Sequence, residues 1–238
     1  EAIRFWRQGI TAPDCAPVLA ATRDRSPAVA LAAIDALAGL CAPVNDRVAR
    51  LRDLAEALPM TETGHAAGEM SWHPAAHALV ALARADRIAA EMLLPRFAGH
   101  RRAQVREYAA RAATVLRDTA ALSALIADGN HNVQAEAITG MSQVRGHAGD
   151  AMYAALLSST GHQVVMAAAT ALAGSRNPSV PGALVEALDR LTAGKRENAR
   201  DARMALLTRL QDVGSVSLTG RLTPYLVDYD STVAKKVA

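Results

Sequence analysis

The sequence predicts an all-α protein built as an α-solenoid, a stack of about six helical hairpins. Three observations lead to this prediction: an alanine-rich composition with few aromatic residues, a helical pattern that recurs along the chain, and an aspartate at a fixed distance before it. Of the 238 residues, 51% are hydrophobic but only 3% are aromatic, so alanine, leucine and valine must form the core. Alanine is the strongest helix former, whereas sheets favour aromatic and β-branched residues.

The recurring pattern consists of small and aliphatic residues at fixed offsets. Counting from Val133, they follow at plus 4, 7, 8 and 11, as Ala137, Gly140, Met141 and Val144. At about 100° per residue these positions share one stripe of a helix, so each copy predicts an amphipathic helix with a narrow, small-residue face. The copies begin, in chain order, at Val29, Ala76, Val105, Val133, Val164, Asn198 and Val233.

A second apolar helix is predicted before most copies of the stripe. It is visible as LSALIADG, MYAALLSSTG, ALVEALDRL and SLTGRLTPYLVD. The repeating unit is therefore a helical hairpin, and the steps of 47, 29, 28, 31, 34 and 35 residues between copies suit hairpins stacked in one array.

The longest step, between the first two copies, contains an inserted loop. Residues 59–72 read PMTETGHAAGEMSW, which is too polar and too rich in glycine for a helix. We expect a single array over residues 1–238 with this loop inserted. Because the chain begins at Glu1 and stops inside an apolar helical pattern, we also expect it to be a fragment of a longer protein.

An aspartate precedes three copies by the same distance. Asp24, Asp128 and Asp228 each stand five residues before the first valine of a stripe. A carboxylate at this turn can accept hydrogen bonds from free backbone N–H groups and meets the positive end of the helix dipole.

Asp-x-x-x-x-Val, with Ala at plus 4 and Ala-Leu at plus 7 and 8, resembles the HEAT repeats of the armadillo-type fold. The resemblance is to the short bacterial kind and covers nearly the whole chain. It implies a right-handed solenoid whose second helices line a concave side, where partners bind. The copies depart from the HEAT pattern at one position, because the basic residue usual after the valine occurs only as Arg106.

The predicted concave strip follows from the stripe. If the stripe faces inward, the positions at plus 2 and plus 6 lie on the opposite side of each helix, at about 200° and 240°. These positions hold Leu31, Asp35, Ala78, Leu82, Glu107, Arg111, Ala135, Thr139, Met166, Thr170, Arg200 and Met204. We expect the partner-binding residues among them to be Leu82, Glu107, Arg111, Thr139, Met166, Thr170, Arg200 and Met204.

The composition of this concave strip favours a protein or peptide partner. It holds two basic and two acidic residues and no aromatic residue, which makes it a poor groove for DNA or RNA. The whole chain, with 26 cationic and 23 anionic side chains, is also close to charge balance. Methionine and leucine with a few charges suit a peptide or a partner helix.

The familiar signatures of catalysis and cofactor binding are missing from the sequence. It has no GxSxG, HExxH or CxxC motif and no phosphate-binding loop, so we expect no catalytic residue, metal or cofactor. Cys15 and Cys41 lie among apolar residues without metal-ligand spacing, and we expect reduced packing residues rather than a disulfide.

Two groups of histidines could suggest a metal site. His73 and His77 are four residues apart, with Glu69 and His65 upstream, but Pro74 favours the first helical position and would leave His73 at the cap. We expect capping and surface histidines there.

The other group lies in DGNHN, residues 128–132, whose polar composition is typical of a metal-binding loop. His131 and its counterpart His162 each stand two residues before a stripe valine. Equivalent positions on neighbouring hairpins lie about 10 Å apart, too far to share a zinc ion whose bonds are about 2 Å. We expect both to be structural turn residues.

The arginine-rich segment 96–118 could bind phosphate. It is interrupted by Glu107 and Asp118, and we expect a solvated helix face.

Three functions stay open at this level. The preferred one is a non-enzymatic scaffold whose concave strip binds a polypeptide. The second is an accessory repeat arm of a larger bacterial enzyme, for example one with a cyclophilin-type prolyl isomerase domain outside this chain. The third is a nucleic-acid-binding solenoid, as in HEAT-like DNA glycosylases. No apolar run reaches the roughly 20 residues of a membrane helix, and the compartment stays open, with the cytoplasm as the default.

Overall fold

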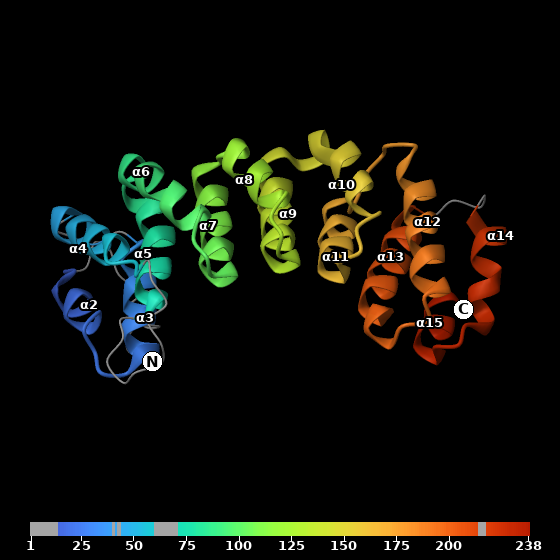
Figure 1. The fold of residues 1–238 in the computed structure, drawn as a ribbon, viewed down its shortest axis with the longest axis horizontal. Helices are drawn as coiled ribbons and strands as arrows, with labels where there is room; N and C mark the ends of the chain where they lie inside the picture. Colours follow the sequence, from blue (N-terminus) through green and yellow to red (C-terminus); the bar gives the residue numbers. More distant parts are fainter. Residues whose placement is uncertain (1–13, 40, 42–43, 60–70, 214–217) are drawn as a thin grey trace. The chain divides into compact units, whose positions relative to one another are not determined.

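A computed structural model describes residues 14–39, 41, 44–59, 71–213 and 218–238 of the chain. Every regular element in these ranges is a helix (Figure 1). The chain divides into two compact units, residues 1–125 and 126–238, called unit 1 and unit 2 below. The predicted all-α class and the stacking of helical hairpins are confirmed. The single array over residues 1–238 stays a prediction.

Unit 1 stacks its second helices side by side. Helix α5 packs against α3 and against α7, and each of the three carries one copy of the stripe. The described elements of this unit are α2 (Ala16–Ala21), α3 (Pro27–Ala36), α4 (Val44–Glu56), α5 (Trp72–Ala85), α6 (Arg87–Ala98), α7 (Ala103–Leu116) and α8 (Thr119–Ile126), which ends at the boundary.

Unit 2 repeats this arrangement. Helix α11 packs against α9 and against α13, and α13 packs against α15. Its described elements are α9 (His131–Arg145), η1 (Gly146–Gly149), α10 (Asp150–Leu156), α11 (His162–Ala171), α12 (Val180–Ala193), η2 (Glu197–Ala199), α13 (Arg200–Val213), α14 (Thr219–Leu222), η4 (Thr223–Val227) and α15 (Ser231–Val237).

The predicted stripe forms the core at most copies. The residues that begin it are fully buried on five helices, at Ala76, Val105, Val133, Val164 and Val233. On the first and sixth copies the buried stripe begins one residue later than predicted. Val29 is 36% exposed and Ala30 is buried, and Asn198 is exposed beside the buried Ala199. The alanines of the stripe let neighbouring second helices approach closely.

The turn aspartates act as predicted. Asp24, Asp128 and Asp228 each accept a hydrogen bond from the backbone N–H group two residues later, at 2.8 Å in all three cases. This carboxylate closes the turn that leads into the second helix, because it satisfies an N–H group that the helix itself cannot.

The same position is filled by other acceptors in copies that lack the aspartate. Ser71, His100 and Ser159 also stand five residues before a stripe, and each accepts from the N–H group two residues later, at 3.3, 3.1 and 3.1 Å. A polar acceptor at this turn is therefore the shared feature, and aspartate is one of three side chains that supply it. In the sixth copy Ala193 stands there, and the N–H group of Lys195 bonds instead to the carbonyl of Thr192.

The histidines predicted at turns lie in the first turns of helices. His131 and His162 are the first residues of α9 and α11, as expected for turn residues. The prediction for Pro74 is wrong, because Ser71 caps α5 and the helix begins at Trp72, so His73 and Pro74 lie inside its first turn. A serine side chain that accepts from the N–H group of His73 outcompetes the preference of proline for the first position.

Two arginines of segment 96–118 donate hydrogen bonds to backbone carbonyls instead of only facing solvent. Arg96 donates to the carbonyls of Glu56 and Leu58 at 2.8 and 2.5 Å, which ties α6 to the end of α4. Arg106 donates to the carbonyl of His100 at 2.8 Å. The expectation of a simple solvated face is wrong for these two residues, because the turns leave backbone carbonyls that guanidinium groups can satisfy.

Candidate functional site

The predicted concave strip is open at some positions and closed at others. Leu82 is fully buried on α5, as is Ala78, so the structure corrects the prediction that Leu82 contacts a partner. Helix α5 packs against α3, α4, α6 and α7, and the side that carries Ala78 and Leu82 is covered. Arg111 on α7 is exposed and Glu107 is half-buried.

The part of the strip in unit 2 is accessible. Thr139 and Thr170 are exposed, and their hydroxyls donate to the carbonyls of Ala135 and Met166 within their own helices, at 3.0 and 2.9 Å. Met166 on α11 and Met204 on α13 are half-buried. The strip in this unit is thus an apolar surface with hydroxyl groups that are already satisfied.

Arg200 forms the charged edge of this surface. It is exposed, and its guanidinium donates to the carboxylate of Asp230 at 2.5 Å. This hydrogen bond holds the pKa of Asp230 below its usual range and raises the pKa of Arg200. Both groups are therefore charged at neutral pH.

Unit 1 contains a hydrogen-bonded chain of three side chains from three successive second helices. Asp35 on α3 lies 2.8 Å from Nδ1 of His77 on α5. The Nε2 atom of the same imidazole lies 2.8 Å from the hydroxyl of Tyr108 on α7. The side chain of Asp35 is 40% exposed and that of His77 is 18% exposed, and Tyr108 is half-buried. We call Asp35, His77 and Tyr108 the relay.

Aromatic and cationic groups surround the relay. The ring of Trp72 stacks on His73 at 3.8 Å between centroids and meets the ring of Tyr108 edge-on at 6.0 Å. The guanidinium of Arg111 lies 4.6 Å from the centroid of the Tyr108 ring. Burial, and then the neighbouring His77, lower the pKa of His73. Neither Trp72 nor Tyr108 stands at a predicted strip position, but the strip residue Arg111 contacts the ring of Tyr108.

Sequence reasoning found Asp35 and Arg111 but missed Tyr108 and the role of His77. Both missed residues stand at plus 3 and plus 1 of their copies, between the buried stripe and the predicted strip. The three relay residues are 42 and 31 positions apart, so the periodicity of one helix carries no sign of their contact. Their side chains meet because the second helices lie side by side.

No metal site emerges from the histidines in the part of the chain that the structure describes. Groups of three or more His, Cys, Asp or Glu side chains that could hold an ion are not found there. Glu69, His65 and most of the predicted loop 59–72 lie outside the described residues, while Trp72 at its end already belongs to α5.

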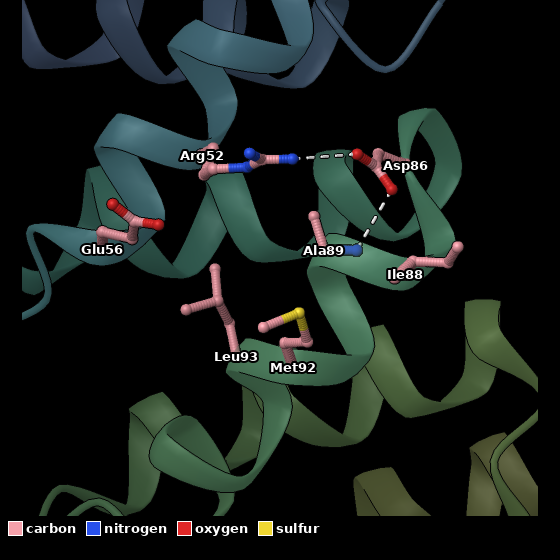
Figure 2. Close-up of a pocket in the computed structure, with 7 residues that line it drawn as sticks. All are labelled: Arg52, Glu56, Asp86, Ile88, Ala89, Met92 and Leu93. Atoms are coloured by element: carbon pink, nitrogen blue, oxygen red, sulfur yellow. Dashed lines mark hydrogen bonds and ion pairs between the residues drawn. The ribbon is translucent and has the colours of Figure 1, made fainter.

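A separate apolar groove lies on the first helices of unit 1 (Figure 2). It has a volume of about 300 Å³, and two side chains of α6 beside it, Ile88 and Met92, are 72% and 79% exposed. At one end Arg52 of α4 forms an ion pair with Asp86 at 3.2 Å, and Asp86 also caps α6 by accepting from the N–H group of Ala89.

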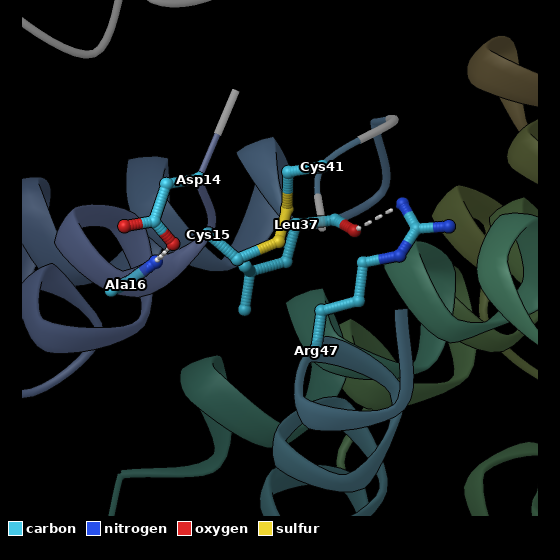
Figure 3. The surroundings of a disulfide bond; sticks show 6 residues. All are labelled: Asp14, Cys15, Ala16, Leu37, Cys41 and Arg47. Atoms are coloured by element: carbon cyan, nitrogen blue, oxygen red, sulfur yellow. Dashed lines mark hydrogen bonds between the residues drawn. A yellow bond between two sulfur atoms is a disulfide. The ribbon is translucent and has the colours of Figure 1, made fainter. Parts of the chain in front are cut away.

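The two cysteines form a disulfide, which corrects the prediction of reduced packing residues (Figure 3). Cys15 immediately precedes α2 and Cys41 follows α3, and both are buried with Cα atoms 5.2 Å apart. The first hairpin folds back on itself and brings together residues that are 26 positions apart, which spacing along the sequence does not reveal. Nearby, buried Arg47 donates to the carbonyl of Leu37 at 3.4 Å.

Comparison with known protein families and with curated proteins finds no match. Solved structures with a similar fold include the complex of CpcE and CpcF of phycocyanin lyase from Nostoc sp. PCC7120. The matching chain is 18% identical in sequence to this one. The alignment covers 97% of this chain and 87% of that chain, with a TM-score of 0.49.

Two engineered proteins are also similar, each at 18% identity over 94% of this chain. The alignments cover 66% and 95% of the engineered chains, with TM-scores of 0.46 and 0.41. These similarities concern the helical-repeat fold.

The prediction of a non-enzymatic chain is corrected by this comparison. One structure with a similar fold belongs to a complex that is named a lyase. The absence of familiar catalytic motifs does not by itself exclude catalysis, because such motifs describe other folds. Separately, among the residues that the structure describes, no helix is both long and apolar enough to cross a bilayer.

Proposed function

We propose that the chain binds a polypeptide through the second helices of unit 2. The observation that supports this proposal is the surface formed by half-buried Met166 and Met204 on the neighbouring helices α11 and α13. Thr139, Thr170 and Arg200, at other predicted strip positions of α9, α11 and α13, are exposed. Methionine side chains are flexible and polarisable, so they adapt to apolar side chains of a partner.

The chemistry of this surface favours an amphipathic helix as the bound element. The hydroxyls of Thr139 and Thr170 already bond within their own helices, so covering them leaves no unsatisfied donor. The carboxylate of Asp230 holds Arg200, which leaves little unbalanced charge to attract nucleic acid. A helix that places apolar residues over the two methionines and polar residues at the edge would fit.

The proposal can be tested without knowing the natural partner. A displayed library of amphipathic helical peptides is selected on the whole chain, and the affinities of the selected peptides are measured by fluorescence anisotropy. We expect Met166→Asp and Met204→Asp each to weaken binding by about tenfold or more, because a buried carboxylate would face the apolar side of the peptide. Circular dichroism should stay unchanged, since neither methionine is fully buried.

Met92→Asp is the matched control. Met92 is 79% exposed on the first helix α6 in unit 1, so the same charge is introduced on another surface. We expect this variant to bind the selected peptides as tightly as the original chain. Equal affinity for all three variants, or a loss confined to Met92→Asp, would show that the surface was chosen wrongly.

A further inference from the structure

The relay of unit 1 has the geometry of an activated nucleophile. In such sites a nucleophile lies within about 2.6–3.2 Å of a general base, and a third group orients the base. Tyr108, His77 and Asp35 meet both distance conditions, since each of the two hydrogen bonds is 2.8 Å long. The proposed polypeptide surface in unit 2 does not use any of these three residues.

The hydrogen bonds fix the direction in which a proton can move. A carboxylate only accepts hydrogen bonds, so Nδ1 of His77 carries the proton that is donated to Asp35. The Nε2 atom of the neutral imidazole then has a free lone pair and accepts the hydroxyl proton of Tyr108. The phenol proton therefore already points at a base that can take it.

A cation and a second aromatic ring lie beside the ring of Tyr108. The cation of Arg111 lies 4.6 Å from the centre of the Tyr108 ring, where it would stabilise charge that develops on the phenolate. The edge contact with Trp72 limits rotation of the ring. Asp35, which is 40% exposed, would stabilise the imidazolium that forms when His77 accepts the proton.

We propose that Tyr108 is a nucleophile for acyl groups, with His77 as its general base and Asp35 as the residue that positions His77. The hydroxyl oxygen of Tyr108 attacks the carbonyl carbon of an activated ester, and Nε2 of His77 takes the phenol proton. A bond forms between the tyrosine oxygen and the acyl carbon, and the bond to the leaving alcohol breaks. His77 then gives the proton to the departing oxygen, so the products are an acylated tyrosine and the free alcohol.

The test uses p-nitrophenyl acetate as the acyl donor and the whole chain as the protein. Acetylation of each tyrosine is followed by peptide mass spectrometry at short reaction times. Tyr229 is an internal control, because it is 48% exposed and lies against Arg203 with no histidine partner among its described contacts. We expect Tyr108 to be acetylated at least about tenfold faster than Tyr229, since general base catalysis contributes about 10²-fold or more. Faster reaction of Tyr229 would overturn the proposal.

Replacing His77 distinguishes a role as general base from a structural role. We expect His77→Ala to slow acetylation of Tyr108 about tenfold or more without slowing Tyr229, and added imidazole to restore the rate by occupying the vacated space. Because imidazole and p-nitrophenyl acetate also form N-acetylimidazole, which acetylates tyrosines in general, the recovery is measured as the rate of Tyr108 relative to that of Tyr229. A purely structural role for His77 predicts no recovery of this ratio, so a ratio that stays low, or a ratio that never fell, contradicts the proposal.

The role of Asp35 is tested with a double-mutant cycle. We expect Asp35→Asn to slow acetylation of Tyr108 when His77 is present. In the His77→Ala background without imidazole, the same change should have no effect, because Asp35 acts only through the imidazole that it positions. A loss of equal size in both backgrounds would assign Asp35 a structural role and overturn this part of the proposal.

Discussion

Arg203 and Asp228 form an ion pair from which water is almost excluded. Their side chains are 1% and 2% exposed, and Asp228 also closes the turn before α15. The guanidinium lies over the ring of Tyr229, at 4.8 Å from its centroid. Taking one partner away from a buried pair leaves the other charge in a medium of low polarity, which costs far more than the loss of an exposed pair.

We predict that Asp228→Asn lowers the free energy of unfolding of unit 2 by about 3 kcal/mol. The asparagine oxygen can still accept from the backbone N–H group of Asp230, so the change removes the charge and keeps the turn. Urea denaturation followed by circular dichroism measures the effect. The control is Asp212→Asn, which breaks the ion pair between Asp212 and Arg209. The side chain of Asp212 is 47% exposed, so this change should cost no more than about 0.5 kcal/mol. Similar losses for both variants would contradict the prediction.

Among the elements, the turn before each second helix carries the most regular contact of the fold. In six of the copies that the structure describes, a side chain five residues before the stripe accepts from the N–H group two residues later. Carboxylate, hydroxyl and imidazole groups all serve, because the position requires only a short polar acceptor.

We predict that Asp128→Ala destabilises unit 2 by about 1 kcal/mol, since the N–H group of Asn130 loses its acceptor. Asp128→Asn keeps an acceptor and should cost less than half as much. Ala193→Asp is the opposite experiment, and it should bring no gain, because the N–H group of Lys195 is already bonded to the carbonyl of Thr192. Thermal melting of the three variants tests the order, and a stabilised Ala193→Asp chain would show that the turn at this copy is not satisfied.

The same elements show what a sequence can and cannot predict. The stripe at Val105, Val133 and Val164 was predictable, because burial on one helix has a period that the sequence repeats. The one-residue offset at Val29 was not predictable, because it depends on how α3 packs against α5. The burial of Leu82 has the same cause, since helices on several sides enclose α5.

The relay and the disulfide show the same limit on a larger scale. His77 and Tyr108 come from different hairpins, and no local pattern marks two residues that are 31 positions apart as partners. Cys15 and Cys41 lie at opposite ends of the first hairpin. Repetition in the sequence predicted which elements form, whereas contacts between unlike positions of neighbouring elements required the three-dimensional structure.

At the scale of the whole molecule, the division into two compact units determines how far a local change should spread. The disulfide between Cys15 and Cys41 closes a segment of 26 residues within unit 1. A cross-link of this length restricts the unfolded chain and contributes about 3 kcal/mol in the chain-entropy account. Reduction should therefore destabilise the first hairpin and the helices that pack on it, beginning with α5.

We predict that the double variant Cys15→Ser and Cys41→Ser loses protection against hydrogen exchange in α2, α3 and α5 but keeps it in α9, α11 and α13. Mass spectrometry of peptides from each unit measures this directly, and the same chain in dithiothreitol should give the same map. The relay lies across α3, α5 and α7, so we also expect acetylation of Tyr108 to slow in the variant. An equal loss of protection in both units would mean that the chain unfolds as one cooperative body and that the disulfide stabilises all of it.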